Sequence, residues 1–259
     1  MNIISQKILT NYKKHQKITL NKYFDKLSKS KSKSDIVFSL VLSSVHSSML
    51  EGVDIDMDSY FNSLDFMPFV LNKDFYRTKD LISGYDYARV KKINKSNILA
   101  VHRIITKNIL AENYRGVLRD KEVVVKNTLT GATVYQGCKV VDLKKQYNLF
   151  IKDVEFLANQ KLSIDEVFYY AAFLHFVFVS IHPFADGNGR LGRLIEKWFL
   201  ATHLGEMAWL IPSEFMYNKR KKNYYQKLAL PGKSYETLNY AKVLDFLLML
   251  PLSLTTKIK

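Results

Sequence analysis

Twelve consecutive residues at positions 182–193, HPFADGNGRLGR, bring two closely spaced glycines together with charged and titratable side chains. Gly187 and Gly189 flank Asn188, and glycines on both sides let the backbone turn sharply with its N–H groups pointing into one concavity. Such a turn at the start of a helix binds anions, because its free N–H groups favour negative charge. The segment therefore predicts an anion-binding turn.

Charged and titratable side chains lie on both sides of this turn. Arg190 and Arg193 are three residues apart, hence neighbours on one helical face, and two arginines beside an anion site suit a polyphosphate better than a single phosphate. Asp186 offers a hard oxygen ligand of the kind that holds Mg²⁺ on a nucleotide. Pro183 forces His182 out of helical geometry, and His182 can accept a proton near neutral pH. Each feature is common by itself, and their combination predicts a catalytic nucleotide site.

HPFADGNGRLGR is similar to the signature of the Fic family, HxFx(D/E)GNGRxxR, at all eight defined positions, and a wider resemblance extends over residues 35–230. The resemblance implies a mainly α Fic-domain fold with one β-hairpin flap before the central helices. It also implies a protein adenylyltransferase, which transfers AMP from ATP to a Ser, Thr or Tyr hydroxyl of a target protein and of itself. In the related Doc branch, which phosphorylates its target, a lysine replaces the second glycine of the loop, so Gly189 favours nucleotidyl transfer.

The resemblance also assigns roles to single residues. His182 would be the general base, Phe184 would hold the loop by packing inward, and Asp186 would bind Mg²⁺ or Mn²⁺ between the α- and β-phosphates of ATP. Arg193 would hold the γ-phosphate. The nucleotide-binding residues that the resemblance implies are Asp186, Gly187, Asn188, Gly189, Arg190, Arg193, Tyr224 and Tyr225.

Two of these residues have a second interpretation. Tyr224 and Tyr225 resemble a tyrosine pair that lies beside the adenosine in family members, and packing of both rings in the core is the alternative. Some relatives have an asparagine seven positions after that pair, where this chain has Gly232, which leaves that nucleotide contact open.

A second short pattern lies near the N-terminus. The segment SSMLEG, from Ser47 to Gly52, resembles the inhibitory motif (S/T)xxxE(G/N), which precedes the core in class II members of the family. Ser47 and Glu51 are four residues apart, one above the other on a helix. The resemblance implies an ion pair between Glu51 and Arg193 that removes Arg193 from the γ-phosphate and presents the α-phosphate badly, so that the enzyme inhibits itself.

Helical patterns account for most of the sequence around these motifs. A helix over 35–51, capped by Ser34 and stopped at Gly52, would carry the inhibitory motif. The stretch from there to Gly84 reads as loop-rich. Further helices are expected over 96–110, over 163–180 with a capping box of Ser163 and Glu166, and over 189–203, 219–228 and 235–248.

One hairpin interrupts the helices. The β-branched runs EVVVK (122–126) and ATVYQ (132–136) flank the polar segment NTLTG. The resemblance makes this hairpin the flap of the family, whose exposed edge a target segment would join as an extra strand. The chain then divides into a basic extension and linker (1–34), a helical region with the inhibitory helix (35–94, the helix at about 35–51), the Fic core (95–232, the flap at about 122–136) and a C-terminal helix (233–259).

Composition adds expectations about partners and location. Much of the net charge of +15 comes from lysines in the first 34 residues, but no zinc-finger spacing or RNP-like motif accompanies them, so we do not expect nucleic-acid binding. A single cysteine, Cys138, excludes an intramolecular disulfide and a cysteine-based zinc cluster. The longest apolar run, Val167 to Ile181, is interrupted by His175 and is too short to span a bilayer, and the N-terminus has no signal-peptide segment. A cytoplasmic protein without a transmembrane segment is expected.

Two other kinds of function stay open at this point. One is another Fic activity: transfer of UMP or phosphate, or removal of AMP with Glu51 positioning a water molecule. The other is a non-catalytic binding module that uses the basic N-terminus. Members of the family often dimerise, so a homodimer is a further expectation from the resemblance. No pattern in the sequence identifies the target protein.

Overall fold

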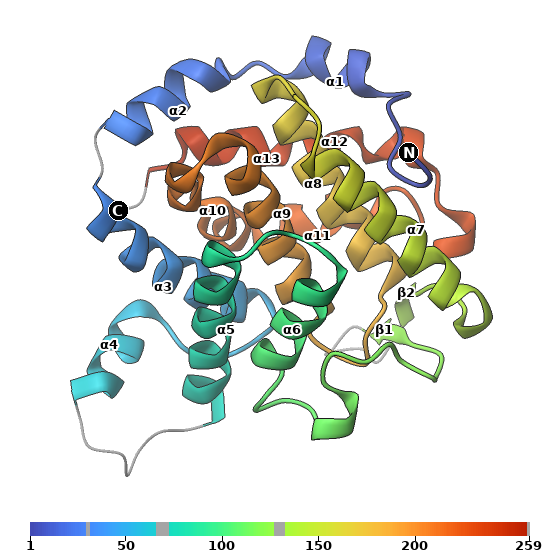
Figure 1. Ribbon diagram of the computed structural model, residues 1–259, viewed down its shortest axis with the longest axis horizontal. Helices are drawn as coiled ribbons and strands as arrows, with labels where there is room; N and C mark the ends of the chain where they lie inside the picture. Colours follow the sequence, from blue (N-terminus) through green and yellow to red (C-terminus); the bar gives the residue numbers. More distant parts are fainter. Residues whose placement is uncertain (30–31, 66–72, 127–132, 258–259) are drawn as a thin grey trace.

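The computed structural model describes residues 1–29, 32–65, 73–126 and 133–257. As the sequence predicted, these residues fold mainly into helices, with one antiparallel hairpin of β1 (Val124–Lys126) and β2 (Thr133–Gln136) (Figure 1). The helices in chain order are α1 (Leu9–His15), α2 (Leu20–Lys29), α3 (Lys33–Leu50), α4 (Met57–Asp65), α5 (Lys73–Val90), α6 (Lys95–Ile105), α7 (Val140–Ala158), α8 (Ile164–Ile181), α9 (Asn188–Leu204), α10 (Ser213–Lys219), α11 (Lys221–Ala229), α12 (Leu244–Leu247) and α13 (Met249–Leu252).

Helices α8 and α9 form the centre of the fold. The loop between them holds the first half of the 182–193 segment, and the second half begins α9 (Figure 1). The predicted capping box is confirmed at the start of α8, where the Ser163 hydroxyl accepts from the Glu166 N–H and the Glu166 carboxylate accepts from the Ser163 N–H at 2.9 Å. Gly192 lets the two helices approach closely, because a β-carbon there would lie 2.7 Å from Val179 Cγ1.

Helix α8 is buried on nearly every side, which accounts for its apolar composition. With 18 residues it is longer than the apolar run counted in the sequence, and by length and composition alone it could cross a membrane. The expectation that this segment is too short was therefore wrong. Since 78% of the helix is buried inside the fold, we interpret it as a core helix.

The first 29 residues pack on the helical core, whereas the sequence suggested a basic extension and linker. The Asp153 carboxylate on α7 accepts hydrogen bonds from the backbone N–H groups of residues 2–4 at 2.6 to 2.8 Å. Tyr12 of α1 is fully buried, with its ring centroid 5.3 Å from that of Tyr169, and Leu20 of α2 is buried as well. Helices α1 and α2 thus cover one flank of the core and leave their lysines exposed (Figure 1).

Helix α7 was absent from the sequence interpretation, although its pattern is regular. Five of its buried residues recur every three or four positions: Leu143, Tyr147, Phe150, Val154 and Leu157. This spacing is typical of an amphipathic helix packed on a core. The signal was therefore present in the sequence.

Helices α3, α5 and α6 pack beside one another next to α9 (Figure 1). Helix α3 begins at a capping box of Ser32 and Asp35, so the expected cap at Ser34 was wrong. The stretch up to Gly84 is not loop-rich: it holds α4 and α5, and α5 buries residues at helical spacing against α3 and α6. Helix α6 ends before the expected boundary at position 110, because the chain after it tightens into three-residue turns.

The hairpin pairs Val124 with Gln136 and Val125 with Tyr135, with a bulge before the end of β1. The predicted turn NTLTG lies outside the described residues. The N–H of Gln136 donates to the Lys233 carbonyl at 2.9 Å, on the side of β2 that faces away from β1. Residues from the C-terminal segment therefore occupy the outer edge of β2.

The C-terminal segment is not the single helix that the sequence suggested. Short helical pieces replace it: Tyr235–Thr237, Tyr240–Val243, α12, α13 and Ser253–Thr255. Asn239 separates the first two, because its side chain accepts from the Ala241 N–H at 3.0 Å and its own N–H donates to the Pro231 carbonyl. An asparagine that binds the backbone locally in this way ends a helix.

Candidate active site

His182 ends α8 in a left-handed conformation, with φ of 55°, the one positive φ outside glycine among the described residues. Such a conformation is costly for a residue with a β-carbon and is found most often at functional sites. Its Nδ1 lies 3.2 Å from the Val179 carbonyl oxygen, so Nδ1–H donates to that oxygen and Nε2 carries the free lone pair. Burial lowers the pKa of His182, which keeps the ring neutral at neutral pH.

Arg119 fastens this end of the loop to the hairpin. Its Nε donates to the His182 carbonyl at 2.8 Å, its Nη1 donates to the Lys121 carbonyl at 2.7 Å, and its Nη2 donates to the Cys138 carbonyl. Gly137 then passes so close that a β-carbon there would lie 2.9 Å from the β-carbon of His182. The segment that follows β2 therefore runs directly beside His182.

Phe184 and Asn188 give the loop its shape. Phe184 is fully buried, as the resemblance implied. Both polar atoms of the Asn188 side chain bind the Phe184 backbone: Oδ1 accepts from its N–H at 3.0 Å and Nδ2 donates to its carbonyl at 2.8 Å. In this structure Asn188 thus holds the loop closed rather than presenting its amide to a ligand.

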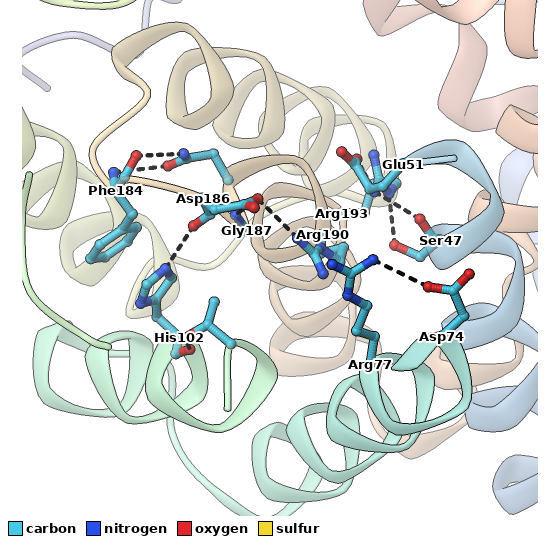
Figure 2. A network of polar contacts seen from close by, with 12 residues as sticks. Ser47, Glu51, Asp74, Arg77, His102, Phe184, Asp186, Gly187, Arg190 and Arg193 are labelled. Atoms are coloured by element: carbon cyan, nitrogen blue, oxygen red, sulfur yellow. Dashed lines mark hydrogen bonds and ion pairs between the residues drawn. The ribbon is translucent and has the colours of Figure 1, made fainter. Parts of the chain in front are cut away.

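His102, from α6, supports the same loop and was missed by the sequence interpretation. Its ring stacks on Phe184 with centroids 3.7 Å apart. Its Nδ1 accepts from the Gly116 N–H at 2.8 Å, so its Nε2–H donates to the Asp186 carbonyl at 2.9 Å (Figure 2). Burial lowers the pKa of His102 to about 4, so this tautomer is neutral at physiological pH.

Asp186 is the exposed carboxylate of the loop. Its Oδ1 accepts from Arg190 Nη2 at 2.9 Å and from the N–H of Gly187, while about half of the side chain is open to solvent (Figure 2). Gly187 has φ of +82°, and a β-carbon there would lie 2.8 Å from Thr106 Cγ2, so only glycine fits this turn. Within the described part of the chain, the other carboxylate oxygen, Oδ2, has no hydrogen bond and is available to a hard cation.

Arg193 lies at the centre of the site and is almost completely buried, with 1% of its surface exposed. Its Nε donates to the Ser47 hydroxyl at 2.8 Å, and its Nη2 donates to the Ser47 carbonyl at 3.1 Å and to Glu51 Oε1 at 2.6 Å (Figure 2). The ion pair that the sequence led us to expect between Glu51 and Arg193 is thus present.

The Glu51 carboxylate also lies against the anion-binding turn. A β-carbon at Gly189, in the first turn of α9, would overlap with Glu51 Oε1. Burial by itself raises the pKa of Glu51, but the charges of Arg193 and Arg190 and the hydrogen bond from Arg193 outweigh it and hold that pKa below its ordinary value. An ionised carboxylate of the chain itself therefore occupies the place at the α9 N-terminus that suits a phosphate.

The two tyrosines of α11 lie in different environments. Tyr224 is buried, and its hydroxyl is within 3.4 Å of Arg193 Nη1. Tyr225 is 40% exposed, and its hydroxyl donates to the Leu50 carbonyl at 2.8 Å, at the end of α3. Both rings thus lie beside the Glu51–Arg193 pair, and Tyr224 also has the core position that was its alternative interpretation.

Residues 92–200 match the family model described as Fic/DOC family. The chain is 32% identical over 154 residues to Protein adenylyltransferase Fic of Drosophila grimshawi, and 29% identical over 155 residues to a protein of the same name from Aedes aegypti. These alignments cover 59% of this chain but only 30% and 29% of the relatives, so the chain spans less than a third of their length.

Solved structures of Fic proteins share the fold. A Fic family protein from Desulfovibrio desulfuricans G20 superposes with a TM-score of 0.75 at 16% identity, over 98% of this chain and 75% of that chain. Fic-1 from C. elegans superposes with a TM-score of 0.65 at 17% identity, over 96% of this chain and 71% of that one. At these identities the likeness concerns the fold.

Proposed function

Because residues 92–200 match the Fic/DOC family model, we propose that the chain is a protein adenylyltransferase that moves AMP from ATP to a Ser, Thr or Tyr hydroxyl of a protein target, and that Glu51 holds this activity down. The observation that carries the proposal is the position of the Glu51 carboxylate, 2.6 Å from Arg193 and against Gly189. A site built to bind the phosphates of a nucleotide explains why both an arginine and a helix N-terminus meet an anion there. The names of the relatives support the same activity.

The three phosphates of ATP can be assigned to successive residues of the 182–193 segment. The α- and β-phosphates would lie at the N-terminus of α9, with Arg190 beside them, and Arg193 would bind the γ-phosphate once Glu51 leaves it. Arg190 is suited to this role because its Nε is buried without a hydrogen-bond partner among the described residues.

Asp186 fits a metal ion that arrives with the nucleotide. The described residues contain no cluster of three or more His, Cys, Asp or Glu side chains that would hold a metal by themselves. Mg²⁺ on a nucleotide commonly uses one carboxylate together with phosphate oxygens, and Asp186 supplies one half-exposed carboxylate beside the turn. When bound, the ion would neutralise charge on the α- and β-phosphates.

His182 would take the proton of the target hydroxyl. Its Nε2 is free to accept, because Nδ1 is committed to Val179. The hydroxyl oxygen attacks the α-phosphorus, its proton passes to Nε2, and the bond from the α-phosphorus to its bridging oxygen breaks, so that pyrophosphate leaves. The fixed left-handed backbone of His182 keeps the imidazole aimed while these bonds change.

The target would reach His182 along the hairpin. Since the outer edge of β2 is occupied near Gln136 by the C-terminal segment, the target strand would join β1, whose Val124 is 44% exposed. Backbone hydrogen bonds along that edge would hold the target segment so that its hydroxyl lies beyond Gly137, next to the imidazole of His182.

Glu51→Gly protein tests the proposal when it is incubated in parallel with ATP labelled at the α-phosphate and ATP labelled at the γ-phosphate. We expect α-label in the protein itself or in lysate proteins, more of it than with wild type, and no γ-label. The matched control is Glu51→Gly with His182→Ala, which keeps the released site but lacks the base. Transfer of γ-label instead would show a kinase, and stronger competition by UTP than by unlabelled ATP would show UMP transfer.

A further inference from the structure

A chain of buried polar side chains starts at Nη1 of Arg193, whereas Glu51 is bound to Nη2. It is formed by Tyr224 of α11, His175 of α8 and Glu196 of α9, and each of them is at most 1% exposed. The contacts run from Arg193 Nη1 to the Tyr224 hydroxyl at 3.4 Å, from that hydroxyl to His175 Nε2 at 3.1 Å, and from His175 Nδ1 to Glu196 Oε2 at 2.8 Å. We call these three residues the buried relay.

The donors in the relay all point the same way. Arg193 can only donate, so the Tyr224 oxygen accepts from it and the Tyr224 O–H is left to donate to His175 Nε2. His175 Nδ1–H then donates to the Glu196 carboxylate. Burial raises the pKa of Tyr224 to about 12, which keeps its proton in place for this arrangement. The negative charge of Glu196 polarises this chain of hydrogen bonds. The Tyr224 oxygen thereby becomes a stronger acceptor for Arg193 Nη1.

Packing alone does not account for these side chains. A buried carboxylate is costly unless its oxygens are paired, and one oxygen of Glu196, Oε1, has no partner among the described residues. Apolar side chains of similar volume would generally fill such a position at no loss of stability. Gly192 lets α8 approach α9 closely at this point. A β-carbon there would lie 3.0 Å from His175 Cδ2, so the absence of a side chain at position 192 leaves room for the His175 ring.

We propose that the buried relay holds the guanidinium of Arg193 where it binds the γ-phosphate, whether or not Glu51 is in place. Tyr224, His175 and Glu196 are then positioning residues for the proposed transfer, and the inference rests on that proposed function. Ser47 and Glu51 both lie at the end of α3, so a movement of that end would remove both from Arg193. The relay comes from α8, α9 and α11 and would stay in place. Without it, a released Arg193 would have many conformations to choose from.

The test is the ratio of ATP to ADP affinity, measured by calorimetry with Mg²⁺ in the Glu51→Gly background. ADP lacks the γ-phosphate, so any direct contact of Tyr224 with the adenosine affects both ligands equally and cancels in the ratio. We expect Tyr224→Phe to weaken ATP binding by about 3- to 10-fold relative to ADP, the usual effect of one buried hydrogen bond. Glu196→Gln, which keeps the shape and removes the charge, should lower the ratio in the same direction.

Tyr217→Phe is the matched control, because the Tyr217 hydroxyl also donates to Glu196 Oε2, at 2.9 Å, but does not lie between Glu196 and Arg193. The ratio of ATP to ADP affinity of this variant should equal that of Glu51→Gly alone. An equal loss with Tyr217→Phe, or an unchanged ratio with Tyr224→Phe, would overturn the relay. Arg193→Ala separates this failure from a failure of the proposed function: if that variant also keeps the ratio, Arg193 does not bind the γ-phosphate at all.

Discussion

The loop between α8 and α9 and the end of α3 meet at Arg193, but they are held in different ways. The loop is fixed from all sides by contacts of buried groups: Asn188 binds Phe184, His102 binds Asp186, and Arg119 binds the carbonyl of His182. The end of α3 has buried contacts too, from Ser47 to Arg193, but its last residues are held by contacts of partly exposed groups, and the Glu51 side chain itself is 31% exposed.

This difference suggests a division of labour. Local openings of a protein start where contacts are few and exposed, and they leave buried, fully bonded parts unchanged. Glu51 could therefore leave Arg193 while the loop keeps its geometry. Such an arrangement would let the restraint be reversible without rebuilding the catalytic centre at each release.

The largest change in transfer activity should come from a substitution in the loop between α8 and α9. His182→Ala in the Glu51→Gly background should reduce transfer by about 10²- to 10⁴-fold, because the variant lacks the imidazole that would accept the proton of the target hydroxyl. ATP affinity, measured by calorimetry, should hardly change, since the proposed phosphate contacts come from the α9 N-terminus, Arg190 and Arg193 and not from His182. Near-normal transfer by this variant would remove His182 from the mechanism.

The loop should also show its dependence on a neutral His102. The pKa of this residue is about 4 in the folded protein, against 6.5 ordinarily. As the pH falls through 6.5, the unfolded chain takes up a proton that folded His102 refuses until about pH 4, so the free energy of unfolding falls across that window, by at most about 3 kcal/mol.

Urea unfolding between pH 7.5 and 4.5 measures this effect. His102→Gln has no titrating group there, so its stability should change less over the window than that of the wild type. Parallel pH curves for the two proteins would mean that His102 does not contribute in this way.

Sequence reasoning was most successful where chemistry is contiguous. Twelve neighbouring residues were enough to predict the turn, and one helical spacing was enough to bring Ser47 and Glu51 to the same side of α3. His102 escaped notice because its partner Asp186 is 84 residues away, and one histidine on an apolar helix has no distinguishing pattern. No local sequence pattern predicts that Arg119 donates hydrogen bonds to three backbone carbonyl groups in separate segments.

Other misses had local causes. The helical spacing of α7 was readable but was passed over, whereas the division of the C-terminal segment depends on Asn239 and on a contact with β2 that only the fold creates. Patterns of burial are thus readable along one helix, but the pairing of distant polar groups is decided by tertiary packing.

Glu51→Gly should have a smaller effect than loss of the base, and in the opposite direction. Coupling between sites typically changes activity by about 5- to 150-fold, and removal of the carboxylate should raise automodification by a factor in that range. Arg193→Ala added to Glu51→Gly should bring activity down again. A folded Glu51→Gly protein, verified by circular dichroism, that labels no more than wild type would show that the ion pair does not restrain the enzyme.

The smallest effect should come from the contacts that fasten the end of α3. The Met49 and Leu50 carbonyls belong to the last turn of the helix, where the helix itself supplies no donors, and they accept from Lys221 Nζ at 2.7 Å and from the Tyr225 hydroxyl at 2.8 Å. A cation at a helix C-terminus is also favoured by the helix dipole. Lys221→Ala should therefore let the end of α3 open more often and raise automodification by roughly 2- to 10-fold, the range expected from one hydrogen bond.

Lys222→Ala is the matched control for this change, because it removes the same charge from the next position. Lys222 is also exposed, and the described structure gives it no contact with α3. Activity should stay near wild type. If Lys221→Ala and Lys222→Ala raise activity equally, the effect is one of net charge and the contact with Met49 does not restrain α3. If Lys221→Ala alone raises it, and adds nothing in the Glu51→Gly background, then Lys221 acts only through the position of Glu51. That result would place the control of this enzyme in the attachment of one helix end, while the loop that would carry out the chemistry stays the same in both states.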